Sequence, residues 1–281
     1  MNNELRVCSV SGGKDSTLTY CLMVEHYGMD FLPLFADTGN EHPITVNYVR
    51  NLHIMAGGPE VVIVKADFTE KLEKKGLKSL DNPFIDMMMW KGRAPSTKAQ
   101  FCTEWVKLWP ILLYLEKNYP TRDWTMFSGI RAAESQRRTL VYLPRGPFQF
   151  NTYFDCDYIL PLLYESKETV IDELEKYGVP LNPLYGLNYG RVGCFPCIHA
   201  NKGELELLPD WAWDKLEEWE NILQRTWFPP GVLPKGWPQI TKASDVRNWC
   251  KTSRGGKNYD LFKTDTTADA PSCLSTWGIC E

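Results

Sequence analysis

The chain has 281 residues, a formal net charge of −4 and nine cysteines. This length can bury a core without disulfides or structural metals, and the slightly acidic balance excludes a global positive field that would draw the protein onto nucleic acid. No apolar run is long enough for a membrane span, and residues 1–4 do not resemble a signal peptide, so we expect a cytoplasmic protein. Cytoplasmic thiols stay reduced, and the cysteines therefore favour metal or redox chemistry over disulfides.

The first chemical motif follows a short β-branched strand at residues 7–10 and precedes an apolar, helix-compatible run. Its two glycines let backbone N–H groups approach a ligand, and the helix start after them favours an anion. A Walker A loop is excluded because Cys8 stands where that loop needs a glycine and Asp15 where it needs a hydroxyl. An ordinary glycine-rich turn is the simpler alternative, but the complete motif favours phosphate binding. The residues expected at the phosphates are Ser11, Gly12, Gly13, Lys14, Asp15, Ser16 and Thr17.

This loop resembles the pyrophosphate-binding loop of the PP-loop ATP pyrophosphatases, which are adenine nucleotide alpha hydrolases. The resemblance implies that the loop binds the β and γ phosphates of ATP while a nucleophile attacks the α phosphate. The products would be an adenylated intermediate and pyrophosphate, with Mg²⁺ offsetting the phosphate charge. Lys14 would stabilise the charge that develops at phosphorus, and Asp15 would orient the loop or bind Mg²⁺.

Strands and helices alternate through the first 180 residues. Strands are expected at residues 7–10, 31–36, 61–64, 124–129 and 158–163, and helices at 40–52, 98–118 and 165–177. This alternation predicts a Rossmann-like α/β fold with a doubly wound, mostly parallel five-stranded sheet. Asp37, Thr38 and Gly39 follow the second strand, at the edge where such sheets bind ligands, so we expect them at the nucleotide. A turn without a role is the alternative.

The expected helix at 98–118 carries one apolar stripe and is interrupted by Pro110, which should loosen or kink it. Cys102 lies on its first turn, where the helix dipole favours a thiolate. The Cys-Thr-x-x-x-Lys-x-x-Pro pattern resembles that of phosphoadenosine phosphosulfate (PAPS) reductase-like proteins and of the ATPases that serve DNA phosphorothioation. The resemblance implies that Lys107 contacts the charged centre of the substrate. Without it, Lys107 would be read as a solvated helix lysine.

A cationic group follows the fourth expected strand, again at the carboxyl edge of the sheet. Guanidinium groups bind phosphate or sulfate in bidentate fashion, whereas a solvated charge run is the simpler alternative. The Gly-Ile-Arg-x-x-Glu-Ser-x-x-Arg pattern resembles one in the same family, so the resemblance covers residues from about 5 to 138. It implies catalytic or nucleotide-binding roles for Gly129, Arg131, Glu134, Ser135 and Arg138.

Cysteines in the second half of the chain are candidates for a metal site. Cys194 and Cys197 form a Cys-x-x-Cys turn, which suits zinc, a redox pair or an iron–sulfur cluster. Two ligands do not close a site, and the spacing of Cys102, Cys273 and Cys280 leaves both the metal and the other ligands open. The family resemblance implies a 4Fe-4S cluster on Cys102, Cys194 and Cys197. We take Cys273 as its fourth ligand and Zn²⁺ as the alternative metal.

We expect two domains. Residues 1–180 should form the nucleotide-binding α/β domain, with an insertion or lid at about 68–99 whose role the pattern does not define. Residues 181–281 should form a helical lobe that packs on the first domain and carries the cysteine cluster. Within this lobe, a helical stretch is expected at residues 204–225.

The leading hypothesis is an ATP pyrophosphatase that adenylates a substrate for iron–sulfur-assisted sulfur transfer. A nucleic acid is the favoured acceptor over a small metabolite, and a cysteine desulfurase is one candidate sulfur donor. The alternative is a reductase that forms sulfite from adenylyl sulfate or PAPS. The chain lacks that family's Glu-Cys-Gly-Leu/Ile-His tail and has only Cys280 near its end. A third hypothesis is a non-catalytic nucleotide-binding regulator. The oligomeric state stays open, and a homodimer is one option.

Overall fold

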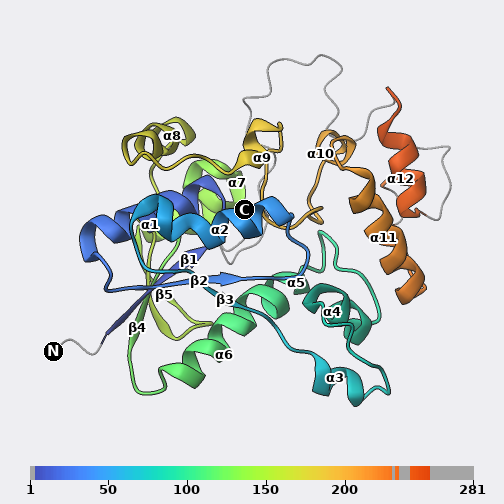
Figure 1. Cartoon of the computed structure of the whole chain (residues 1–281), viewed down its shortest axis with the longest axis horizontal. Coiled ribbons are helices and arrows are strands. Elements are labelled where there is room, and N and C mark those ends of the chain that lie inside the picture. The colour runs from blue at the N-terminus through green and yellow to red at the C-terminus, as the bar shows by residue number, and fades with distance from the viewer. Residues whose placement is uncertain (1–3, 230–231, 234–240, 254–281) are drawn as a thin grey trace.

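The computed structural model describes residues 4–229, 232–233 and 241–253. Its centre is a six-stranded sheet with the order β3-β2-β1-β4-β6-β5 (Figure 1). The strands are β1 (Leu5–Val10), β2 (Leu32–Ala36), β3 (Val62–Val64), β4 (Trp124–Phe127), β5 (Phe148–Asn151) and β6 (Cys156–Ile159). All neighbours pair in parallel except β5, which runs antiparallel to β6. The predicted mostly parallel α/β fold is therefore confirmed.

The sheet has one strand more than the five that the sequence predicts, because β5 forms a hairpin with β6 at the sheet edge. Phe148 and Phe150 of β5 are 75% and 59% exposed, so this strand lacks the buried apolar pattern of an interior strand. The fifth predicted strand is also displaced. Its first two residues, 158 and 159, end β6, whereas residues 161–164 form a turn.

Helices cover both faces of the sheet (Figure 1). Helix α1 (Lys14–Tyr27) contacts α2 (Pro43–Ala56) and α8 (Lys167–Lys176) on one face, and α6 (Trp109–Asn118) covers β2 and β3 on the other. Successive residues of β1 point to opposite faces of the sheet. Val7 lies in the hydrophobic core under α6, whereas Cys8 lies in the core under α1. The chain adds β2 and β3 on one side of β1 and returns to β4 on the other. The point where this direction reverses, between β1 and β4, is the expected ligand crevice.

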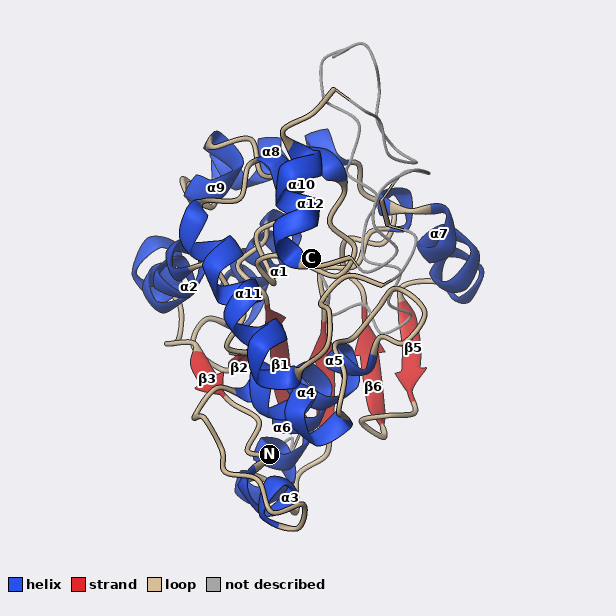
Figure 2. Cartoon of the chain, turned by 90° about the vertical axis from the view of Figure 1, so that its right-hand side faces the viewer, coloured by secondary structure: helices blue, strands red, loops and turns tan. Residues whose placement is uncertain are grey.

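Residues 68–99 contain two short helices, α3 (Thr69–Glu73) and α4 (Pro83–Lys91), where the sequence predicts an insertion without periodic order. Side chains of α4 share a hydrophobic core with α11 (Asp210–Leu223) and α12 (Ala243–Cys250). The Phe84 ring stacks on Trp219 at 5.5 Å, and Figure 2 shows α4 beside α11. The segment is thus a packed part of the C-terminal core.

Where the sequence predicts a helical stretch at 204–225, the structure has two helices, α10 (Lys202–Glu206) and α11, separated by residues 207–209. Two further α-helices are α7 (Gln136–Tyr142) and α9 (Pro183–Gly186), and short 3₁₀ segments cover Ala132–Glu134 and Leu143–Arg145. Within the described parts of the chain, no helix has the length and apolar character that a membrane crossing requires.

The predicted helix at 98–118 consists of α5 (Phe101–Thr103), a π-helical turn η1 (Glu104–Leu108) and α6. Pro110 explains the irregularity, because it has no N–H to donate to the carbonyl four residues earlier. The N–H of Trp109 donates instead to the carbonyl of Glu104, five residues back. The interruption expected at Pro110 is therefore a widened turn inside a continuous helical segment.

Candidate functional site

The Ser-Gly-Gly-Lys-Asp-Ser motif forms the turn between β1 and α1, at the carboxyl end of the central strand. Gly12 adopts a left-handed φ of +82°, and a Cβ there would lie 2.8 Å from the Thr45 methyl group, so only glycine fits. The backbone N–H groups of Gly12 and Ser16 donate to no other atom within the described chain. The turn therefore presents donors and the positive end of α1 to an anion.

Hydrogen bonds within the loop fix its shape. The Ser16 hydroxyl accepts from the N–H of Ser11 at 3.1 Å, lies 2.9 Å from the Ser11 hydroxyl, and donates to the carbonyl of Gly13 at 3.0 Å. Thr17 is buried deeper, and its hydroxyl accepts from Tyr48 on α2. The serines thus shape the phosphate turn, whereas Thr17 joins α1 to α2.

Asp15 and Arg131 form an ion pair in which both side chains have no exposed surface. The Nε of Arg131 donates to Asp15 Oδ1 at 2.7 Å, and the Lys14 ammonium lies 3.5 Å from Oδ2. This pair joins the end of β4 to the start of α1 across the crevice. Its location favours loop orientation as the role of Asp15, because the carboxylate is already held between two cations.

The close approach of β4 to α1 depends on Gly129. A Cβ at this position would lie 2.5 Å from the backbone carbon and oxygen of Asp15 and 2.8 Å from the Ser16 nitrogen. Because these atoms belong to the backbone of the phosphate loop, no side-chain rotation can relieve the contact.

We therefore expect Gly129→Ala to lower the free energy of unfolding by about 1–3 kcal/mol and to weaken nucleotide binding. Urea denaturation and ATP titration measure the two effects. Gly186→Ala is the matched control, since a Cβ there meets nothing within 4 Å. Unchanged stability and affinity in Gly129→Ala would contradict the close packing of β4 on the loop.

Arg138 and Glu134 make a second, almost buried ion pair one helical turn apart. Burial raises the pKa of Glu134, and the charge of Arg138 opposes that rise. The Ser135 hydroxyl accepts from the N–H of Arg138 at 3.2 Å and so caps α7. Ser135 and Glu134 therefore hold Arg138 in place, and Arg131 and Arg138 supply two buried guanidinium groups behind β4.

Asp37, Thr38 and Gly39 follow β2 at the same edge of the sheet. The Asp37 carboxylate accepts from the Gly39 N–H at 2.9 Å and pairs with Lys65 at 2.9 Å. The Thr38 hydroxyl donates to Glu41 Oε1 at 2.6 Å, and the Thr38 N–H donates to Oε2 at 3.0 Å. The predicted polar turn is present and is ordered by these contacts.

Lys107 lies on η1 and is 8% exposed. Its charge lowers the pKa of Glu41, although burial dominates and raises that pKa to about 7. The reading of Lys107 as a solvated lysine is therefore wrong. In a regular α-helix, the side chains of two residues five apart point about 140° away from each other around the helix axis. The π turn is wider, so the side chains of Cys102 and Lys107 point in more similar directions. Both side chains are buried.

The Cys194–Cys197 turn packs directly on the polar turn after β2. The N–H of Phe195 donates to the carbonyl of Asn40 at 2.5 Å, and the Cys194 sulfur lies 3.9 Å from the Thr38 hydroxyl. The Cys197 sulfur accepts from Arg191 at 3.8 Å and from the His199 N–H at 3.5 Å.

Cys102 is buried in the same hydrophobic cluster as Phe195, with Cys194 packed against that cluster. Among residues 4–229, 232–233 and 241–253, no three His, Cys, Asp or Glu side chains are grouped so that they could hold a metal ion. Cys273 and Cys280 lie outside the described residues. The described thiols therefore do not by themselves form a metal site, and the ligand set stays a prediction.

Four residues at the site were missed, and three of them, Asn182, Tyr185 and Lys215, act through tertiary contacts. The Tyr185 hydroxyl accepts from the Lys14 N–H at 3.2 Å, and the Asn182 amide donates to the Gly12 carbonyl at 3.1 Å. Lys215 of α11 donates at 2.7 Å to the side chain of Asn40 and to the carbonyl of Phe195, and burial lowers its pKa to about 8. Glu41 is the fourth. The Asn-Pro dipeptide at 182–183 was the one available signal, since it marks a helix start.

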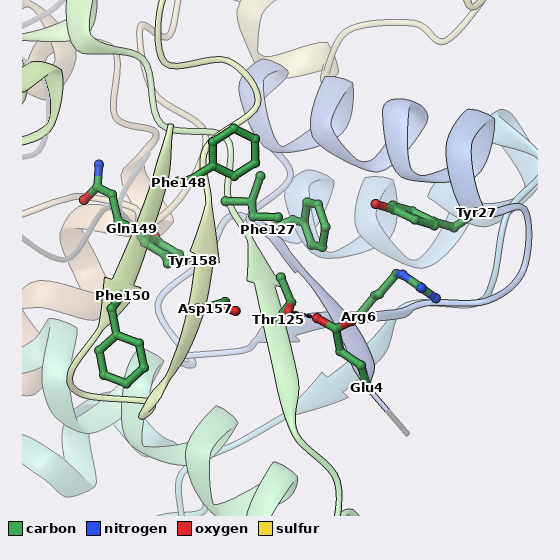
Figure 3. A pocket seen from close by; sticks show the side chains of 11 residues that line it. Glu4, Arg6, Tyr27, Thr125, Phe127, Phe148, Gln149, Phe150, Asp157 and Tyr158 are labelled. Atoms are coloured by element: carbon green, nitrogen blue, oxygen red, sulfur yellow. Dashed lines mark hydrogen bonds between the residues drawn. The ribbon is translucent and has the colours of Figure 1, made fainter. Parts of the chain in front are cut away.

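A cavity of about 540 Å³ lies on the sheet away from the phosphate loop (Figure 3). Glu4, Arg6 and Thr125 line it near the beginning of β1 and β4, and Tyr27 contributes from the end of α1. The Arg6 guanidinium lies 4.5 Å from the centre of the Tyr27 ring. Parallel sheets bind ligands beyond the carboxyl ends of their strands, so this cavity lies away from the edge at which the nucleotide is expected.

Comparisons with known proteins agree with these motifs. Residues 6–200 match the family described as the phosphoadenosine phosphosulfate reductase domain. An uncharacterized 37.8 kDa protein of Escherichia phage 186 is 33% identical over 99% of this chain and 97% of its own length. An adenosine 5′-phosphosulfate reductase of Sinorhizobium fredii is 31% identical over 38% of this chain and 41% of its own. The crystal structure of PAPS reductase from Candida auris is 18% identical, with a TM-score of 0.47, and covers 70% of this chain and 83% of its own. Since the family match spans more than half of the sequence, this chain belongs to the phosphoadenosine phosphosulfate reductase domain family.

Proposed function

We propose that the protein is an ATP pyrophosphatase that adenylates a substrate and prepares it for sulfur transfer. An oxygen of the substrate forms a bond to the α phosphorus of ATP, and the bond from that phosphorus to the β-phosphate oxygen breaks. Pyrophosphate leaves, and the substrate carries AMP. A hydrosulfide ion then bonds to the activated centre, and AMP departs with the substrate oxygen. The resemblance to phosphorothioation ATPases points to a nucleic acid as acceptor.

The phosphate loop is the observation that carries this proposal. Gly12 and Ser16 offer backbone N–H groups at the start of α1, and Lys14 adds an ammonium beside them. These donors suit the β and γ phosphates, which become the leaving group. Arg131 and Arg138 place positive charge behind β4, and Lys107 places it at the end of β2. This arrangement supports stabilisation of charge around the α phosphorus.

Bound Mg²⁺ would offset phosphate charge. Because the Asp15 carboxylate is buried between Arg131 and Lys14, we propose that the ion is held by phosphate oxygens and water rather than by this carboxylate. The 4Fe-4S cluster predicted on Cys102, Cys194, Cys197 and Cys273, or Zn²⁺ in its place, stays a prediction, and no step of the proposed reaction runs through it.

Product analysis with ATP labelled at the α phosphate tests the proposal. We expect labelled AMP, or a labelled AMP adduct, together with an equal amount of pyrophosphate. Release of ADP and inorganic phosphate would overturn it, because the β–γ bond would then be the one cleaved. Nucleotide binding without pyrophosphate release, with candidate acceptors present, would support a regulator instead.

The matched family favours one alternative, reduction of adenylyl sulfate or PAPS by a thiolate. The thiolate would bond to the sulfate sulfur as the nucleotide leaves, and a second thiol would then release sulfite by forming a disulfide. Incubation with either sulfonucleotide and a dithiol measures this activity. Sulfite formation that is lost in Cys280→Ser would favour the reductase over the pyrophosphatase.

A further inference from the structure

Tryptophan rings and cations gather on one surface over α3, α4 and η1, which we call the aromatic–basic surface. The Lys71 ammonium lies 4.6 Å from the centre of the Trp109 ring and 5.7 Å from those of Trp90 and Trp105. The Lys91 ammonium lies 4.0 Å from Trp90 and 4.8 Å from Trp105. The surface consists of Lys71, Lys75, Trp90, Lys91, Arg93, Phe101, Trp105 and Trp109, none of which is fully buried.

Positive charge on this surface exceeds negative charge. Residues 65–100 carry eight Lys and Arg residues against five Asp and Glu, although the whole chain is acidic. Within the described residues, Lys71, Lys75, Lys91 and Arg93 take part in no ion pair. Burial lowers the pKa of Lys91, the nearby carboxylate of Glu104 on η1 opposes this shift, and repulsion from Arg93, Lys75 and Lys71 adds to it. Four cations thus lie close together with the Glu104 carboxylate beside them, and positive charge is in excess.

The chemistry of the surface indicates what it would bind. Cations in excess of carboxylates attract a chain of phosphates, and a base can stack on a partly exposed indole ring by displacing the lysine that lies over it. Trp90 and Trp105 contact each other edge to face, with ring centres 4.7 Å apart, so their outer faces point in different directions. A single strand can offer both unstacked bases and phosphates, whereas a duplex keeps its bases stacked inside.

The position of this surface connects it to the phosphate crevice. Trp105 and Lys107 lie on the same π turn, two residues apart, so they project to different sides of the segment. Trp105 faces the aromatic–basic surface, whereas Lys107 acts on Glu41 at the carboxyl end of β2. The helical segment η1 thus lies between this surface and Glu41 at the carboxyl end of β2.

We propose that the aromatic–basic surface binds a single-stranded nucleic acid and presents it to the phosphate crevice. This deepens the proposed function and rests on it, because the bound strand would be the acceptor that is adenylated. Lys75 and Arg93 contact phosphates, and Trp105 stacks on a base.

Fluorescence anisotropy with a labelled 12-nucleotide single strand tests the proposal across a range of salt concentrations. We expect Trp105→Leu to weaken binding about tenfold without changing the salt slope, because it removes stacking and no charge. The double variant Lys75→Gln/Arg93→Gln should reduce the slope of log K against log salt by about 1.4, since two phosphate contacts are lost. Both positions are exposed, but the Lys75 ammonium donates to the carbonyl of Trp90, so the urea midpoint of the double variant is measured alongside its binding.

The matched control is Lys117→Gln/Lys176→Gln, which removes two exposed cations on α6 and α8 and should leave the slope unchanged. The proposal would be overturned if the protein bound a duplex as tightly as the single strand, or bound neither. It would also be overturned if heparin displaced the strand equally well from the natural protein and from Trp105→Leu, because the rings would then contribute nothing to binding. Pyrophosphate release is measured on the same preparations. Release without strand binding would remove only this inference, whereas strand binding without release would remove the proposed reaction and the acceptor role of the strand but not its binding to this surface.

Discussion

Lys14→Gln should lower the rate of pyrophosphate release from ATP by about 100- to 1,000-fold. The Lys14 ammonium is nearly buried beside the phosphate loop, with its side chain 10% exposed, and glutamine keeps a polar group of similar length without the charge. Removing one preorganised donor from a charged transition state typically costs this much. Steady-state measurement of pyrophosphate at saturating ATP gives the effect.

Lys78→Gln is the matched control, because Lys78 is exposed on the loop after α3. It should release pyrophosphate at the natural rate. A Lys14→Gln protein that binds ATP normally and retains full activity would show that the loop is not the reaction site. Loss of folding is excluded by comparing the urea midpoints of the two variants.

Arg131→Met should lower the free energy of unfolding by about 3–5 kcal/mol. The substitution leaves the Asp15 carboxylate buried without its guanidinium partner, and an uncompensated buried charge is costly. Arg137→Met is the control on the same segment, because Arg137 is exposed and its loss should change the stability by less than about 0.5 kcal/mol.

A double-mutant cycle separates the ion pair from the rest of the Arg131 side chain. Asp15→Asn alone should also destabilise the protein, but the double variant Asp15→Asn/Arg131→Met should lose less than the sum of the two single losses. Urea denaturation provides all four free energies. Strict additivity would mean that the 2.7 Å contact contributes nothing to stability.

Local sequence patterns predict the parts of this fold that depend on local residues. The buried apolar strands, the glycine turn and its lysine can be identified because strand periodicity and backbone freedom are local properties. Because β1, β2 and β4 are parallel, their carboxyl ends lie at the same edge of the sheet. Residues 11–16, 37–39 and 129–138 follow these strands and therefore meet at that edge.

Other features depend on contacts that no local pattern records. Strand β5 exposes Phe148 and Phe150, so its apolar residues do not indicate a buried strand. The methionine run at 87–89 lacks helical periodicity by itself and becomes core only where α11 covers α4. Tyr185 and Lys215 reach the site from distant segments. The cysteine ligands stay a prediction, because Cys273 lies outside the described residues.

The π turn at Glu104–Leu108 holds one residue more than a regular α-helical turn would. Deletion of one residue within this turn would let the segment rewind as a regular α-helix, and Cys102 and α6 would keep about the same rotation relative to each other. Deletion of two residues would instead turn Cys102 by about 100° away from its cluster with Phe195. Among homologues, this stretch should therefore differ in length by one residue more readily than by two.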